Sequence, residues 1–136
     1  LKKSDVSKEL SKPLVTSIVP KTPTIGKMPP RELALVAVDE KDGSRRIVGV
    51  ARYITGPEPE AAEFAVVVAD DWHGRGVARM LMTRLIECAR VAGLKRLEGT
   101  VLRGNHNMLK FTAALGFATR DNPEDREQVT VTLELA

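Results

Sequence analysis

The key segment of this chain reads Asp71-Trp72-His73-Gly74-Arg75-Gly76-Val77-Ala78, and it joins two segments of different periodicity. Before it, residues 63–69 form a short, β-branched run that predicts a strand. After it, residues 79–92 carry an apolar stripe at helical spacing. A glycine-containing turn from a strand into a helix gathers unpaired backbone N–H groups at the positive end of the helix dipole. This arrangement predicts a site for a phosphate or pyrophosphate group.

Two familiar phosphate loops do not fit this segment. The loop GxxxxGK[ST] needs a lysine and a hydroxyl residue, which do not follow Gly74 or Gly76 at that distance. The dinucleotide fingerprint GxGxxG needs a glycine where Arg79 stands. The remaining pattern is His73-x-x-Gly76-x-Ala78. It resembles the pyrophosphate loop of the GNAT superfamily of acyl-CoA-dependent N-acetyltransferases, Gln/Arg-x-x-Gly-x-Gly/Ala, with histidine in the first position.

A second motif downstream resembles the same family. Residues 95–102 predict the next strand, and Asn105 then opens a helix that runs to Leu115-Gly116-Phe117. The resemblance covers residues 33–136, and residues 62–117 look most like the acetyltransferase domain of bacterial protein-lysine acetyltransferases. It implies an α/β (α+β) fold of the GNAT type. We therefore expect a mixed, mostly antiparallel sheet flanked by helices, with splayed central strands.

Size and composition fit a single soluble domain. The chain has 136 residues and a net charge of +3. Its apolar runs are far shorter than the roughly 18 residues of a membrane span, and it shows no secretory signal, so we expect no membrane partner. The single cysteine, Cys88, fits a reducing cytoplasm, and two histidines without a cysteine cluster predict no metal site.

The basic charge is concentrated in the N-terminal segment. Residues 1–30 hold six lysines against two acidic residues, which is +4, so residues 31–136 carry 3 − 4 = −1. We therefore divide the chain into a basic, Pro-rich N-terminal segment or linker (1–30) and the acetyltransferase domain (31–136). Because the domain itself is not basic and has few aromatic residues, nucleic acid is not an expected partner.

The remaining segments predict the order of the elements. Residues 4–11 suggest a short helix, 14–19 a strand and 20–30 an extended linker. Strands are predicted at 33–38, 46–54 and 128–135, with a short strand before the last one. Family members usually carry two helices between the first two strands, and residues 19–31 leave no room for them. Either the acceptor side is truncated, or a partner domain or a second copy of the chain supplies it.

The resemblance implies which residues bind acetyl-CoA as acyl donor. The pyrophosphate is expected on the backbone N–H groups of residues 74–78, where glycine lets the backbone approach closely. Arg75 and Arg79 add charge-assisted hydrogen bonds or are simply a solvated helix face. Asn105 either reaches the pantetheine or caps its helix. The expected set is Val66, Val67, Val68, His73, Gly74, Arg75, Gly76, Val77, Ala78, Arg79, Asn105 and Met108.

The resemblance also implies a general base, Glu63. It is an acid at the start of an otherwise apolar strand, and we expect it to be partly buried; the alternative is an exposed carboxylate at a strand end. The family's frequent tyrosine acid corresponds to Thr112, and the only tyrosine, Tyr53, lies elsewhere, so we name no general acid. Cys88 falls within the helix stripe, which argues against an acyl-cysteine route.

These observations predict transfer of an acetyl group from acetyl-CoA to a primary amine by direct attack in a ternary complex. A protein lysine is the first acceptor, on the closest resemblance. A small-molecule amine is the alternative within the same chemistry. A different alternative is a non-catalytic, acyl-CoA-sensing regulatory domain.

Overall fold

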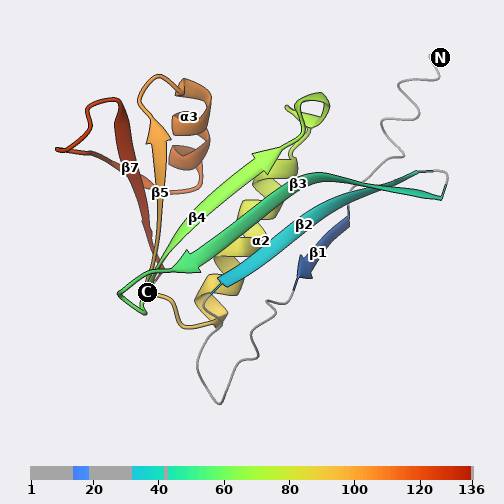
Figure 1. Ribbon diagram of the computed structural model, residues 1–136, viewed down its shortest axis with the longest axis horizontal. Coiled ribbons are helices and arrows are strands. Elements are labelled where there is room, and N and C mark those ends of the chain that lie inside the picture. Colours follow the sequence, from blue (N-terminus) through green and yellow to red (C-terminus); the bar gives the residue numbers. More distant parts are fainter. Residues whose placement is uncertain (1–13, 19–31, 42, 136) are drawn as a thin grey trace.

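The computed structural model describes residues 14–18, 32–41 and 43–135, the first range by its backbone only. Within these residues, a seven-stranded sheet in the order β1-β2-β3-β4-β5-β7-β6 carries two α-helices and a short 3-10 helix, η1 (Figure 1). The predictions for residues 4–11 and 19–31 lie outside the described residues. The elements are β1 Leu14–Ile18, β2 Glu32–Lys41, β3 Ser44–Thr55, β4 Ala61–Val68, η1 Asp70–Trp72, α2 Val77–Val91, β5 Arg96–Leu102, α3 His106–Ala114, β6 Ala118–Asp121 and β7 Gln128–Glu134.

The sheet is antiparallel except at one place. Strands β4 and β5 are parallel, and their register covers only Ala61–Glu63 against Arg96–Glu98. Beyond these residues the two strands diverge, so that they form a fork that opens toward their C-terminal ends (Figure 1). The predicted mixed, mostly antiparallel sheet with splayed central strands is therefore confirmed. Strand β1 pairs with β2, so the sheet includes five residues of the segment 1–30.

An aromatic ring fills the point where the strands separate. The next pair in the register would be Phe64 and Gly99, but a Cβ atom on Gly99 would lie 2.5 Å from Cε1 of Phe64. The Phe64 ring also packs on Phe117, with 5.1 Å between the ring centroids. The Phe64 side chain thus occupies the space that a larger residue at position 99 would need. Gly99 lets the Phe64 ring approach the backbone of β5 closely, as glycines within strands often do.

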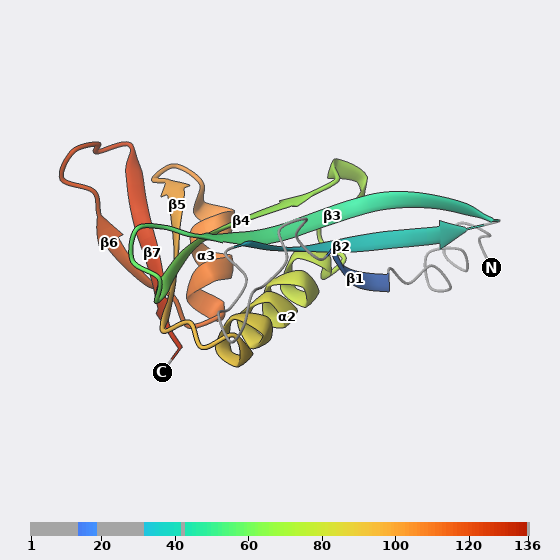
Figure 2. The same ribbon diagram turned by 60° about the horizontal axis from the view of Figure 1, so that its bottom comes forward.

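Helix α2 covers one face of the sheet, against β2, β3 and β4 (Figure 2). It begins two residues before the predicted position and ends in a Schellman motif, in which Leu94 N–H donates to the Ala89 carbonyl and Gly93 N–H to that of Arg90. Gly93 has the positive φ of 85° that this motif requires. The predicted apolar stripe faces the core, with buried Val77, Leu81, Met82, Leu85, Ile86 and Ala89.

The opposite face of β3 and β4 is open in the described part of the chain. Arg52 and Ile54 of β3 and Glu63, Ala65 and Val67 of β4 are exposed on it. Within the described residues, none of the helices has the length and apolar character needed to cross a membrane.

Candidate active site

The turn before α2 leads into a helix start that exposes backbone N–H donors. Gly74 and Gly76 have left-handed φ angles of 75° and 80°, which glycine adopts at little cost. Gly76 is the N-cap of α2 and provides no side-chain cap, and the Gly76 carbonyl accepts from Met80 N–H. The N–H groups of the first helical turn therefore point outward without an intrahelical acceptor. The loop has the local geometry predicted for an anion site.

His73 closes this loop onto the preceding strand. Its Nε2 atom lies 2.9 Å from the Val68 carbonyl oxygen, so Nε2 carries the proton that makes this hydrogen bond. In the neutral ring Nδ1 is then an acceptor only, and donation to a phosphate requires the imidazolium form. The Nε2 donor of His73 therefore ties the loop to the end of β4, a use that sequence reasoning missed.

A pair of charged residues fastens the loop to the sheet. The Arg46 guanidinium of β3 donates two hydrogen bonds to the Asp71 carboxylate, with N···O distances of 2.6 and 2.7 Å. This hydrogen-bonded guanidinium holds the pKa of Asp71 below its usual value. Asp71 lies in η1, the short 3-10 helix between β4 and the glycine turn. Sequence reasoning missed Arg46, because the pair is separated by 25 residues.

The two arginines near the loop differ in their surroundings. The guanidinium carbon of Arg75 lies 3.8 Å from the centre of the Trp72 ring, and Trp72 is buried. This cation–π contact orders Arg75 beside the free N–H groups of the helix start. Arg79 is exposed in the first turn of α2, which is compatible with either predicted role.

The fork between β4 and β5 exposes an edge of β4 to which no described strand is added. Residues 64–68 of β4 pair with β3, whereas the register with β5 ends at Glu63. Of the valines expected to bind acetyl-CoA through their backbone, Val66 and Val68 pack against the core and Val67 is exposed. A ligand with amide groups can therefore be added along this edge as another strand would be.

Asn105 caps the helix on the other side of the fork. Its Oδ1 accepts a hydrogen bond from Met108 N–H at 3.2 Å, so the predicted N-cap role is confirmed. The two remaining amide protons of Asn105 are exposed donors, and the half-buried Met108 packs against the core. The starts of α2 and α3 thus follow the C-terminal ends of β4 and β5, at the open side of the fork (Figure 1).

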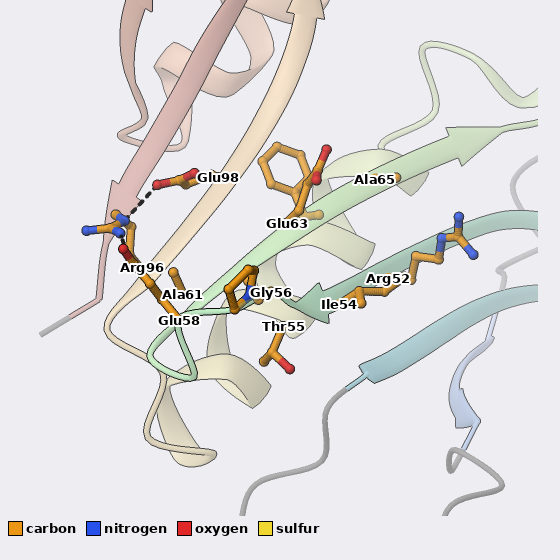
Figure 3. Close-up of a pocket in the computed structure, with 13 residues that line it drawn as sticks. Arg52, Ile54, Thr55, Gly56, Glu58, Ala61, Glu63, Ala65, Arg96 and Glu98 are labelled. Atoms are coloured by element: carbon orange, nitrogen blue, oxygen red, sulfur yellow. Dashed lines mark hydrogen bonds and ion pairs between the residues drawn. The ribbon is translucent and has the colours of Figure 1, made fainter.

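A pocket of about 620 Å³ lies at the closed end of the fork. Glu63 and Glu98 occupy opposite positions in the parallel register and both line this pocket, on neighbouring strands (Figure 3). The lining residues are Arg52, Ile54, Thr55, Gly56, Pro57, Glu58, Ala61, Ala62, Glu63, Phe64, Ala65, Arg96 and Glu98.

The carboxylates of this pocket are not equivalent. Arg96 binds both Glu58, at 2.9 Å, and Glu98, at 2.8 Å, as Figure 3 shows. Within the described residues, the Glu63 side chain makes neither an ion pair nor a hydrogen bond, so its carboxylate remains available to accept a proton. The expected partial burial of Glu63 is wrong: the residue is exposed, because the outer face of β4 is uncovered.

The positions considered for a general acid lie inside the protein. Thr112 is fully buried, and its hydroxyl donates to the Leu109 carbonyl at 3.2 Å. Tyr53 is fully buried on the face of β3 that packs toward α2, and burial raises the pKa of its phenol. Neither residue lines the pocket at Glu63. The described residues thus offer no acid at these two positions.

The loop and the pocket lie at the two ends of β4. Ala69 follows Glu63 by six positions, which at about 3.3 Å per residue is roughly 20 Å. An anion site and a free carboxylate at this separation suit a ligand that has an anionic group at one end and a reactive group at the end of a long arm. Acetyl-CoA has this form, because a pantetheine chain separates its pyrophosphate from its thioester.

Comparison with known proteins agrees with this arrangement. The model of the acetyltransferase (GNAT) family matches residues 13–117. The chain therefore belongs to the GNAT family, whose members use acetyl-CoA as acyl donor.

Two named acetyltransferases and one crystal structure are similar to this chain. Acetyltransferase PA5475 of Pseudomonas aeruginosa is 36% identical over 105 residues, which are 77% of this chain and 56% of that protein. Acetyltransferase Pat of Mycolicibacterium smegmatis is 37% identical over 71 residues, 52% of this chain and 21% of that protein. The crystal structure of the GNAT domain of S. lividans PAT superposes with a TM-score of 0.66 at 25% identity, covering 77% of this chain and 61% of that one. The matched part of the chain thus covers 61% or less of the length of each of these three proteins.

Proposed function

We propose that this chain transfers the acetyl group of acetyl-CoA to a primary amine by direct attack in a ternary complex. The observation that carries the proposal is the position of Glu63 at the closed end of the fork, with no partner for its carboxylate among the described residues. Two helices, α2 and α3, start at the open side of the same fork. The amine nitrogen forms a bond to the acetyl carbon, the carbon–sulfur bond breaks, and the thiolate of CoA leaves and takes a proton.

The donor is held at the open side of the fork in this proposal. Its pyrophosphate binds the N–H groups that follow Gly76, and Arg75 and Arg79 add positive charge. The pantetheine arm lies along the free edge of Val66–Val68, with the exposed amide of Asn105 on the other side. The donor-binding residues are those expected from the sequence.

Glu63 is the general base of the proposed reaction. At pH 7.5 less than about 1% of a lysine with a pKa of about 10.4 is deprotonated, so forming the neutral amine costs about 4 kcal/mol. A free carboxylate in the pocket gives the departing proton an acceptor. Because no acid from the described residues is assigned, the leaving thiolate takes its proton from water.

A protein lysine is the first acceptor class that we propose, because the sequence of residues 62–117 resembles the acetyltransferase domain of bacterial protein-lysine acetyltransferases. A small amine is the alternative acceptor. The pocket supports both, since its outer side is open in the described part of the chain.

The experiment that tests the proposal replaces Glu63 by Gln. We expect the E63Q variant to lose about 10²- to 10⁴-fold in kcat, because it has no base, and to bind acetyl-CoA with unchanged affinity in calorimetry. Glu60→Gln is the matched control: Glu60 is exposed, pairs with Lys95 and does not line the pocket, so its kcat should be that of the wild type.

Two results would contradict the proposal. Equal turnover of the wild type and the E63Q variant would exclude Glu63 as the base. Binding of acetyl-CoA by the wild type without acetylation of any amine in a broad screen would favour an acyl-CoA-sensing domain instead.

A further inference from the structure

We infer that Glu98 is a second acceptor-binding residue, which selects amines that arrive as ammonium ions. The inference rests on the proposed function and concerns the acceptor side of the same pocket. It starts from the register of the fork, in which Glu98 of β5 is directly opposite Glu63 of β4. Directly opposed residues on neighbouring strands project from the same face of the sheet, and both of these residues line the pocket.

The charge of the pocket suits a cationic acceptor. Its lining holds three carboxylates, of Glu58, Glu63 and Glu98, and two guanidinium groups, of Arg52 and Arg96, so the formal charge is −3 + 2 = −1. A single ammonium group brings this charge to zero. A neutral or anionic acceptor would leave the pocket with its excess negative charge or increase it.

Arg96 holds Glu98 in position without using its whole carboxylate. The contact joins Nε of Arg96 to Oε1 of Glu98 as an ion pair that lacks hydrogen-bond geometry, and the same guanidinium donates to Glu58. A carboxylate has about four acceptor sites, so Glu98 keeps sites for a further donor. Its side chain is 36% exposed and therefore accessible. Arg96 thus links Glu58 of the β3–β4 turn to Glu98 of β5, and Glu98 lines the pocket beside this pair.

The two opposed carboxylates then have separate functions. Glu98, already paired with Arg96, binds the ammonium form of the acceptor through charge-assisted hydrogen bonds. Glu63, which has no partner of its own among the described residues, accepts the proton that the ammonium releases before the nitrogen attacks. Glu98 therefore contributes to acceptor binding, and Glu63 to the chemical step.

The test uses acetyl-CoA, the best alkylamine from a screen of lysine peptides, polyamines and amino sugars, and aniline, which is uncharged at pH 7.5. In the Glu98→Gln variant we expect the KM for the alkylamine to rise about tenfold, with kcat within about twofold of the wild type. The KM for aniline should stay unchanged, because this acceptor brings no charge for Glu98 to bind.

The matched control is Glu134→Gln, which removes the same charge from β7 directly opposite Arg96 but outside the pocket. It should leave both KM values unchanged. Calorimetric binding of acetyl-CoA with wild-type affinity checks that each variant is folded.

The failures of the inference and of the proposed function are distinguishable. If the wild type acetylates amines and the E98Q variant has an unchanged alkylamine KM, or an equal change for aniline, the role of Glu98 is refuted while the proposed function stands. If E98Q loses kcat while E63Q keeps full activity, Glu98 and not Glu63 is the base, and this assignment is refuted. Failure of the wild type to acetylate any amine refutes the proposed function and, with it, this role of Glu98.

Discussion

The phosphate loop and the pocket at the fork lie at opposite ends of β4 and are built in different ways. The loop takes its donors from consecutive residues, the N–H groups that follow Gly76, and two glycines set the backbone angles that lead into them. The pocket takes two of its three carboxylates, those of Glu63 and Glu98, from opposed positions on two strands, 35 residues apart in the sequence. A local site depends on backbone conformation, whereas a site between strands depends on the packing that sets their register. Substitutions should therefore affect the two regions differently.

The largest effect should come from the loop glycine that precedes α2. We expect Gly76→Glu to weaken acetyl-CoA binding by more than about 100-fold in calorimetry, because it places a carboxylate beside the pyrophosphate. The substitution also forces an L-residue into a φ of 80°.

Gly43→Glu separates the two contributions to this effect. Gly43 has a nearly equal φ of 77° and open space around it, but it lies in the β2–β3 turn. The Gly43→Glu substitution should lower the free energy of unfolding by about 1–2 kcal/mol through backbone strain. It should leave the affinity for acetyl-CoA unchanged. An equal loss of affinity in both variants would mean that the loop does not bind the donor.

An intermediate effect is expected at the fork, from Gly99→Ala. The new methyl group would lie 2.5 Å from the Phe64 ring, which is buried against Phe117 and has little freedom to move. Overpacking of this kind costs about 1–3 kcal/mol of unfolding free energy, measurable by urea denaturation. Gly104→Ala is the control, since a Cβ there meets nothing within 4 Å. Wild-type stability of the G99A variant would show that Phe64 does not depend on Gly99 for its place at the fork.

The smallest effect should come from Asp71→Asn, which removes the exposed pair with Arg46. Because the folded-state pKa of Asp71 lies below its ordinary value of 3.8, the pair stabilises the fold above that pH and is lost as the pH falls through the folded pKa. The difference in Tm between the wild type and the D71N variant should thus be constant near neutral pH and shrink below pH 3.8.

Asp70→Asn is the control for this pair. Asp70 is the preceding residue and is fully exposed, and within the described part of the chain its carboxylate makes a single contact, at 3.8 Å from His73 Nε2. At neutral pH the Tm of the D70N variant should differ from that of the wild type by less than the Tm of the D71N variant does. A Tm difference of D71N that persists unchanged at low pH would exclude the ion pair as its cause.

Much of the fold was predictable because its signals are local. The helix that follows the loop, the C-terminal glycine Gly93 and the helix start at Asn105 each depend on residues within one or two turns of one another. The burial of Glu63 was predicted wrongly for a nonlocal reason. Nothing in the strand itself indicates whether its outer face is covered, and in the described residues it is open.

The sequence by itself determined the loop glycines, the capping residues and the apolar stripe of α2, because backbone preference and helical spacing act over a few residues. Only the tertiary structure decided three nonlocal features: the pairing of Arg46 with Asp71, the contact of Phe64 with Gly99, and the opposition of Glu63 and Glu98. Each brings together residues that are at least 25 positions apart in the sequence. Their meeting depends on strand register, which is set by how the core packs rather than by any local pattern.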